Sequence, residues 1–176
     1  MDFTETPLPG AFIVTLTSIA DARGSFTRTF CQRRLAEHGI VLSVAQCNRS
    51  RNARRGTLRG MHFQCAPHEE AKLVRCSRGA LWDVIIDLRS GSSSIGRWFG
   101  VELSEANDTS LFVPAGFAHG FQTLVDDTII EYTMSEFYDP ASASGVRWND
   151  PAFGITWPVA EPVLSDRDQA FPDWHE

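Results

Sequence analysis

Ten short runs of β-branched and aromatic residues constrain the fold of this chain more than any other feature. Turn residues such as Gly and Pro separate the runs, which lie at residues 11–17, 25–30, 43–48, 58–63, 72–76, 80–88, 97–103, 110–113, 117–124 and 128–135. Many short strands at close spacing, without long crossover helices, are typical of a β-sandwich or barrel. The sequence therefore predicts an all-β jelly roll.

Helices have little room between these runs. One short helix is predicted at residues 31–38, where Gly39 would end it. The segment after Pro140 carries Trp148, Trp157 and several prolines, and we expect it to wrap the body with one late helical turn. Because the 176 residues contain no repeat or linker, they are predicted to form a single domain, 1–176.

Charge and hydropathy exclude several classes of partner. The net charge of −6 argues against general nucleic-acid binding. No apolar run is long enough to cross a bilayer, and the N-terminus lacks the basic start and apolar stretch of a secretion signal, so we expect no membrane partner and a cytoplasmic location. The four cysteines form no CxxC pair and are interpreted as reduced core residues.

Strand alternation turns three titratable side chains toward the interior. Lys72, the only lysine of the chain, His119 and Tyr132 each share a face with apolar residues two positions along the same predicted strand. A lysine on an inward face needs a partner or a function. The pattern predicts a cavity lined by these groups.

Two further candidates, Arg59 and His62, do not fit strict alternation. They fall on opposite faces of one predicted strand, although a position near the same cavity would suit both. Gly60 between them is a candidate for a β-bulge that re-aims one of the two. The sequence leaves this point open.

Positive charge is concentrated in one segment. Residues 49–59 contain five arginines and no acidic residue in an otherwise acidic protein. The planar guanidinium fork suits phosphate and carboxylate, so the cluster is a candidate anion site. A solvated basic loop is the alternative.

Metal binding and proton transfer are the two chemistries to compare. The run from Pro114 to His119 matches the second half of the metal pattern of cupins, with His68 and Glu69 or Glu70 as further donors. Gln64 stands, however, where the first half needs a second histidine, and an amide oxygen is a poor substitute on a transition metal.

Proton transfer is favoured over metal chemistry. It needs a base, an acid on the opposite side of the substrate and a cation for the charge of the intermediate, and His62, Tyr132 and Lys72 supply these three types. No metal or other cofactor is expected.

Motifs that follow one another through nearly the whole chain complete this interpretation. They are DARGSF (21–26), QCN (46–48), RGMHFQ (59–64), KLVR (72–75), DVIIDLR (83–89), GRW (96–98), LS (103–104), VPAGFAHGF (113–121) and LSDRD (164–168). Together they resemble the dTDP-4-dehydrorhamnose 3,5-epimerase family. The resemblance implies a cupin-type jelly roll (a double-stranded β-helix) and a homodimer that exchanges N-terminal strands. It also implies a nucleotide-linked 4-keto-6-deoxy sugar as substrate and chemistry without a metal.

The resemblance also assigns roles to residues. His62 would be the base, held by Asp168; Lys72 would stabilise the enolate oxygen; and Tyr132 would return a proton from the opposite face. Arg59 and His119 match positions that hold the sugar and its diphosphate. The nucleotide side would be bound by Arg23, Phe26, Gln46, Asn48 and Tyr138.

Two departures from the family pattern bear on the substrate. Arg28 stands where the family usually has an acidic residue on the nucleotide side, and residues 67–71 are more acidic than the common rhamnose-pathway form. A 3-monoepimerase or isomerase acting on a different nucleotide-4-ketosugar is therefore an alternative. A metal-dependent cupin enzyme and a non-catalytic sugar-binding module are the other classes left open.

Overall fold

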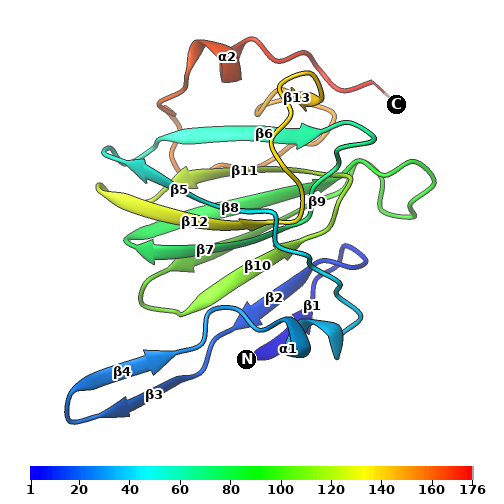
Figure 1. The fold of residues 1–176 in the computed structure, drawn as a ribbon. Coiled ribbons are helices and arrows are strands. Elements are labelled where there is room, and N and C mark those ends of the chain that lie inside the picture. Colours follow the sequence, from blue (N-terminus) through cyan, green and yellow to red (C-terminus); the bar gives the residue numbers. More distant parts are fainter. Residues whose placement is uncertain (176) are drawn as a thin grey trace.

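Two antiparallel sheets face each other in the computed structural model, which describes residues 1–175 (Figure 1). One sheet has the order β1 (Asp2–Glu5), β2 (Phe12–Thr15), β10 (Thr109–Val113), β7 (Lys72–Arg78), β12 (Thr128–Met134) and β5 (Gln46–Asn52). The other has the order β13 (Ala143–Gly145), β6 (Leu58–Gln64), β11 (Phe117–Thr123), β8 (Ala80–Asp87) and β9 (Trp98–Ser104). This confirms the predicted jelly roll.

Among residues 1–175, four elements lie outside the two main sheets. The strands β3 (Ser18–Asp21) and β4 (Gly24–Thr27) form a separate hairpin that projects from the body (Figure 1). The helix α1 (Gln32–Ala36) lies within the predicted range 31–38 but ends two residues earlier, and Gly39 follows it at a positive φ of 73°. The helix α2 (Asp166–Gln169), the predicted late turn, lies above β6 in the figure. In residues 1–175 no helix is long and apolar enough to span a membrane.

All ten predicted strands are present, and three more were missed. The missed strands β1, β3 and β13 have only three or four residues each, and β3 is exposed along its whole length, so none shows a buried periodicity. The strand β5 was predicted to end at residue 48 but continues to Asn52, because β12 pairs with it throughout. Part of the arginine cluster is therefore strand, not loop.

Apolar side chains from both sheets form the core between them. The main cluster includes Val74, Leu111 and Ile130 from one sheet and Ile85 and Phe121 from the other. The cysteines do not all belong to it: Cys76 is buried, but Cys47 and Cys65 are exposed. The interpretation of the cysteines as core residues is wrong for these two.

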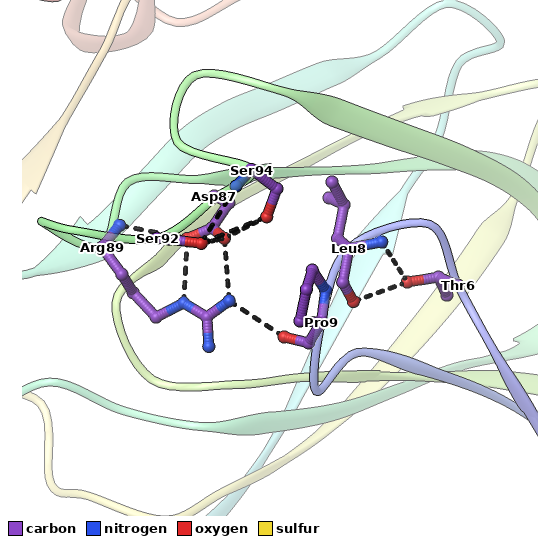
Figure 2. A network of polar contacts seen from close by, with 7 residues as sticks. All are labelled: Thr6, Leu8, Pro9, Asp87, Arg89, Ser92 and Ser94. Carbon is purple, nitrogen blue, oxygen red and sulfur yellow. Dashed lines mark hydrogen bonds and ion pairs between the residues drawn. The ribbon is translucent and has the colours of Figure 1, made fainter.

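A buried carboxylate fastens the N-terminal segment to the end of β8. Asp87 is fully buried and accepts bonds from the Arg89 guanidinium (2.7 and 2.9 Å), Ser92 Oγ (2.6 Å) and Ser94 Oγ (2.6 Å), as Figure 2 shows. The same guanidinium donates to the Pro9 carbonyl at 2.9 Å. Burial opposes ionisation, but the bonds from Arg89, Ser92 and Ser94 outweigh it and hold the pKa of Asp87 well below its usual range.

Replacing Asp87 with Asn should lower the free energy of unfolding by about 1–3 kcal/mol, because the part-buried Arg89 guanidinium loses its counter-charge and Ser92 and Ser94 lose a charged acceptor. Because the pKa of Asp87 is lower in the folded than in the unfolded protein, its carboxylate stabilises the fold at pH values above the unfolded pKa, about 4. This stabilisation is lost as the pH falls further toward the folded pKa. Urea unfolding measures the free energy of unfolding at each pH. Between neutral pH and pH ~3 it should fall less in the Asp87→Asn variant than in the wild type. The control is Asp127→Asn, which loses only an exposed ion pair with Arg51 and should hardly change the free energy of unfolding. Equal destabilisation by the two substitutions would contradict the role of Asp87.

Candidate active site

A cavity of about 370 Å³ opens between the two sheets. Seven of the eleven residues predicted from the sequence line it: Asn48, Arg59, His62, Lys72, His119, Tyr132 and Tyr138. They come from β5, β6, β7, β11, β12 and the segment after β12. The inward positions predicted for Lys72, His119 and Tyr132 are therefore confirmed.

A β-bulge at Gly60 brings Arg59 and His62 to the same side. On β11 their partners are Phe121 and His119, two residues apart, whereas Arg59 and His62 are three residues apart on β6. Gly60 has φ of 150°, and a Cβ there would lie 2.6 Å from the Cα of Gly120. Only glycine fits this close approach. The bulge that the sequence left open is present.

His62 is paired with Asp168, which lies 106 residues away in the sequence. Its Nε2 is 2.7 Å from Asp168 Oδ1. Asp168 sits in α2, whose N-cap Ser165 accepts the Asp168 backbone N–H at 3.1 Å. Burial opposes ionisation of Asp168, but the hydrogen bond and charge of His62 and the Ser165 contact keep its pKa below the usual value. The carboxylate therefore orients the imidazole and stabilises its protonated form.

The C-terminal segment holds this pair in place. Gly145 of β13 pairs with His62, and a Cβ at Gly145 would lie 2.6 Å from the Phe171 ring. The Phe171 ring consequently packs edge-on against His62, with centroids 5.6 Å apart. Further along, the Arg147 backbone N–H donates to the Pro172 carbonyl at 2.9 Å. The expected wrapping segment thus builds one side of the site.

Lys72 forms a buried ion pair with Glu70. Its Nζ is 2.9 Å from Glu70 Oε1, and the two side chains are 7% and 6% exposed. The carboxylate balances the ammonium charge, which permits the burial of both. Sequence reasoning considered Glu70 only as a metal donor, although an acid two residues before an inward lysine was the available signal.

A second histidine–carboxylate pair lies beside Tyr132. His119 Nε2 is 2.8 Å from Asp83 Oδ1, and the rings of His119 and Tyr132 meet edge to face with centroids 6.1 Å apart. Burial, with a further contribution from the Asp83 charge, raises the pKa of Tyr132 far above its usual value, so the phenol keeps its proton. Asp83 was missed, although it shares an inward strand face with Leu81 and Ile85.

The cavity is electropositive. Its lining among the described residues includes four basic side chains (Arg49, Arg59, Lys72 and Arg167) and one carboxylate, Glu70. Asn52 Oδ1 accepts the Arg59 Nε–H at 2.9 Å and fixes that guanidinium. The candidate anion site is thus built by part of the arginine cluster.

The rest of the arginine cluster points elsewhere. The guanidinium of Arg51 lies 3.4 Å from Asp127, and that of Arg55 donates to the Leu124 carbonyl at 3.0 Å. Arg51 and Arg55 lie at the surface and do not line the cavity.

The predicted nucleotide-side residues are only partly assembled. Gln46 lines an adjoining cavity of about 350 Å³ together with Asn48 and Tyr138, and its Oε1 accepts the Tyr138 backbone N–H at 2.9 Å. Arg23 and Phe26 lie on the exposed β3–β4 hairpin, outside both cavities. One chain does not bring these two residues to the site, and their role stays a prediction.

The donors of the metal alternative are not grouped. Within residues 1–175 no set of three His, Cys, Asp or Glu side chains is arranged to hold a metal ion. The Gln64 amide donates to the carbonyls of His68 (2.8 Å) and Phe137 (3.1 Å), and its Oε1 accepts the Asp139 N–H (2.7 Å). Gln64 therefore ties two loops together at the rim of the cavity.

Comparison with known proteins identifies the family of this chain. The family model described as dTDP-4-dehydrorhamnose 3,5-epimerase matches residues 5–176. The chain belongs to the dTDP-4-dehydrorhamnose 3,5-epimerase family. A relative of that name from Sinorhizobium fredii is 45% identical over 153 residues, which are 86% of this chain and 78% of the relative.

Solved members of the family share the fold closely. The dTDP-4-dehydrorhamnose 3,5-epimerase of Bacillus anthracis, solved with TDP and PPi bound, has a TM-score of 0.96 and 42% identity, covering 98% of this chain and 99% of that one. ChmJ, a 3′-monoepimerase from Streptomyces bikiniensis solved with dTDP-quinovose, has a TM-score of 0.89 and 36% identity, covering 96% and 85%. Membership in the epimerase family confirms the predicted fold class and the isomerase interpretation.

Proposed function

We propose that this protein inverts C3 and C5 of a nucleotide-linked 4-keto-6-deoxy sugar of the dTDP-4-dehydro-6-deoxyglucose type, in deoxysugar and polysaccharide biosynthesis. One observation carries the proposal: His62 backed by Asp168, the ammonium of Lys72 and the protonated phenol of Tyr132 surround a single cavity. These are the base, the cation and the acid that proton transfer next to a ketone requires.

The reaction follows from the acidity of the two centres. The C4 ketone acidifies the protons on C3 and C5; His62 removes one, and the electron pair moves into the carbonyl to give an enolate. Lys72 stabilises the enolate oxygen, and Asp168 stabilises the imidazolium. Tyr132 then gives its proton to the opposite face of the carbon, which inverts the centre. The His62 imidazolium releases its proton to solvent and the Tyr132 phenolate takes one from solvent, which resets both groups for the second centre.

The charge of the cavity supports a nucleotide diphosphate as the rest of the substrate. Arg59 and Arg49 are placed to pair with phosphate oxygens, for which guanidinium is well suited. The adjoining cavity at Gln46, Asn48 and Tyr138 would then receive the nucleoside. The related Bacillus anthracis enzyme was solved with TDP bound.

The function is tested with 4-keto-6-deoxyglucose linked to dTDP, UDP, CDP or GDP, with metal content measured on the same sample. We expect a product inverted at C3 and C5 from at least one of them, without stoichiometric metal. Inversion at C3 alone would support the monoepimerase alternative, since ChmJ, a 3′-monoepimerase, has the same fold. No product from any nucleotide would reject the proposal.

We further propose a single-domain homodimer in which N-terminal strands are exchanged and the β3–β4 hairpin of each protomer reaches the other protomer's cavity. Arg23 and Phe26 are exposed on this hairpin and lie outside the cavities of their own chain. A cytoplasmic setting suits the exposed free thiols of Cys47 and Cys65, because thiols stay reduced there.

The hairpin proposal predicts complementation between two defective variants. Arg23→Ala should raise KM about tenfold through the loss of a charged contact, with little change in kcat. Hybrid dimers of Arg23→Ala and His62→Asn, purified with two different tags, contain one site with an intact His62 and the partner subunit's Arg23. These hybrids should regain half the wild-type activity at the wild-type KM; hybrids without low-KM activity would show that Arg23 does not act across the dimer.

A further inference from the structure

One oxygen of the Glu70 carboxylate has no hydrogen-bond donor among residues 1–175 of the free protein. Oε1 is bound by Lys72 Nζ at 2.9 Å, but Oε2 is buried and has no hydrogen-bond partner within residues 1–175. The side chain is 6% exposed and lines the cavity together with Lys72. A buried carboxylate oxygen without a donor is unfavourable, so it marks a place where a ligand supplies one.

The backbone around the Glu70–Lys72 pair is held rigidly. Ala71, between the two, donates its backbone N–H to Ser135 Oγ at 2.7 Å, and the Ser135 backbone N–H donates to the Ala71 carbonyl at 3.0 Å. Lys72 also pairs with Met134 in the sheet. The backbone on both sides of the ion pair is therefore fixed beside the cavity, and a small rotation of the Glu70 side chain brings the buried Oε2 to a ligand there.

We propose that Glu70 is a specificity-determining residue whose Oε2 accepts a hydrogen bond from the C3 hydroxyl of the substrate. This inference rests on the proposed function. In the proposed reaction the Lys72 ammonium binds the C4 ketone oxygen. Because Glu70 is paired with this ammonium, the carbons next to C4 are the part of the sugar nearest to Glu70. Of the two carbons next to that ketone, C3 carries a hydroxyl, whereas C5 carries a methyl group and the ring oxygen and offers no donor.

The pair thus matches the two groups of an α-hydroxyketone. The ketone oxygen accepts from the ammonium, and the neighbouring hydroxyl donates to the carboxylate. A sugar without the C3 hydroxyl leaves a buried charged oxygen unpaired, and sites that bind a hydroxyl in this way reject its deoxy analogue strongly. Glu70 therefore selects 3-hydroxy over 3-deoxy sugars.

The test compares two substrates that share a nucleotide: the 4-keto-6-deoxy sugar and its 3-deoxy analogue. Deuterium incorporation from heavy water gives kcat/KM for each. The wild type should prefer the 3-hydroxy sugar by about tenfold to a hundredfold, the effect of one hydrogen bond to a charged group. Glu70→Gln should reduce that ratio about tenfold by losing rate on the hydroxy sugar. Glu69→Gln, an exposed neighbour, is the matched control and should keep the wild-type ratio.

Each contrary outcome has a separate meaning. If Glu70 only holds Lys72, the substitution will lower both rates by one factor, the ratio will not change, and the inference fails. A wild-type ratio near one overturns it even if Glu70→Gln does not fold. If the wild type exchanges no deuterium into the 3-hydroxy sugar with any nucleotide, the proposed function fails and the inference with it.

Discussion

His62→Asn is expected to abolish epimerisation while leaving the fold intact. General-base catalysis contributes about 10²–10⁴-fold, and the amide cannot take a proton from carbon, so kcat/KM should fall by that factor. The His62 side chain is 39% exposed, so its replacement removes little buried contact and thermal unfolding should change by only a few degrees. Initial rates and unfolding curves, measured on the same preparation, check both parts.

The control for His62 is His68→Asn. His68 is 43% exposed and lies outside the cavity, 4.0 Å from Asp139. It should keep full activity. If His62→Asn retains more than about a tenth of the wild-type rate, a loss smaller than general-base catalysis normally supplies, His62 is not the base.

Tyr132→Phe is expected to separate proton removal from inversion. His62 remains, so the substrate proton is still abstracted and replaced by deuterium on the same face once the imidazolium has exchanged with solvent. Return from the opposite face loses its donor, and formation of the epimer should fall about 10²–10⁴-fold. Tyr132 lines the cavity, so the loss of its hydroxyl opens no void in the core and should hardly change stability.

NMR of one sample in heavy water measures both quantities for Tyr132→Phe, because it reports deuterium content and configuration together. Deuterium that enters the substrate without epimer formation supports the assignment. Unchanged epimer formation would remove Tyr132 from the mechanism. Loss of exchange and inversion in the same proportion would place Tyr132 in the first step instead of the second.

Local periodicity explains how much of the fold could be predicted. Large apolar residues alternate with small or polar ones along β11 and β12, and the inward His119 and Tyr132 were identified from that alternation. The hairpin strand β3 buries no face, so it left no pattern to detect. The bulge at Gly60 was foreseen as an option only, since its geometry depends on close contact with Gly120 in another strand.

Side-chain partners were harder to predict than side-chain directions. The contact of His62 with Asp168 depends on where the C-terminal segment crosses β6, and no spacing encodes that path; the family resemblance supplied it. Asp83 and Glu70 could have been found, because each is an acid close in sequence to inward-facing residues. The absence of Arg23 and Phe26 from the cavity of one chain could not be predicted from strand patterns.

Deuterium wash-in by the wild-type protein tests the central claim most directly. The protein is incubated with dTDP-4-keto-6-deoxyglucose in heavy water, and C3 and C5 are followed by NMR. The account predicts deuterium at both carbons, together with inverted product, in protein free of metal. Deuterium at C3 alone would contradict inversion at two centres. Absence of exchange at both carbons would contradict the assignment of His62, Lys72 and Tyr132 to proton transfer on this substrate.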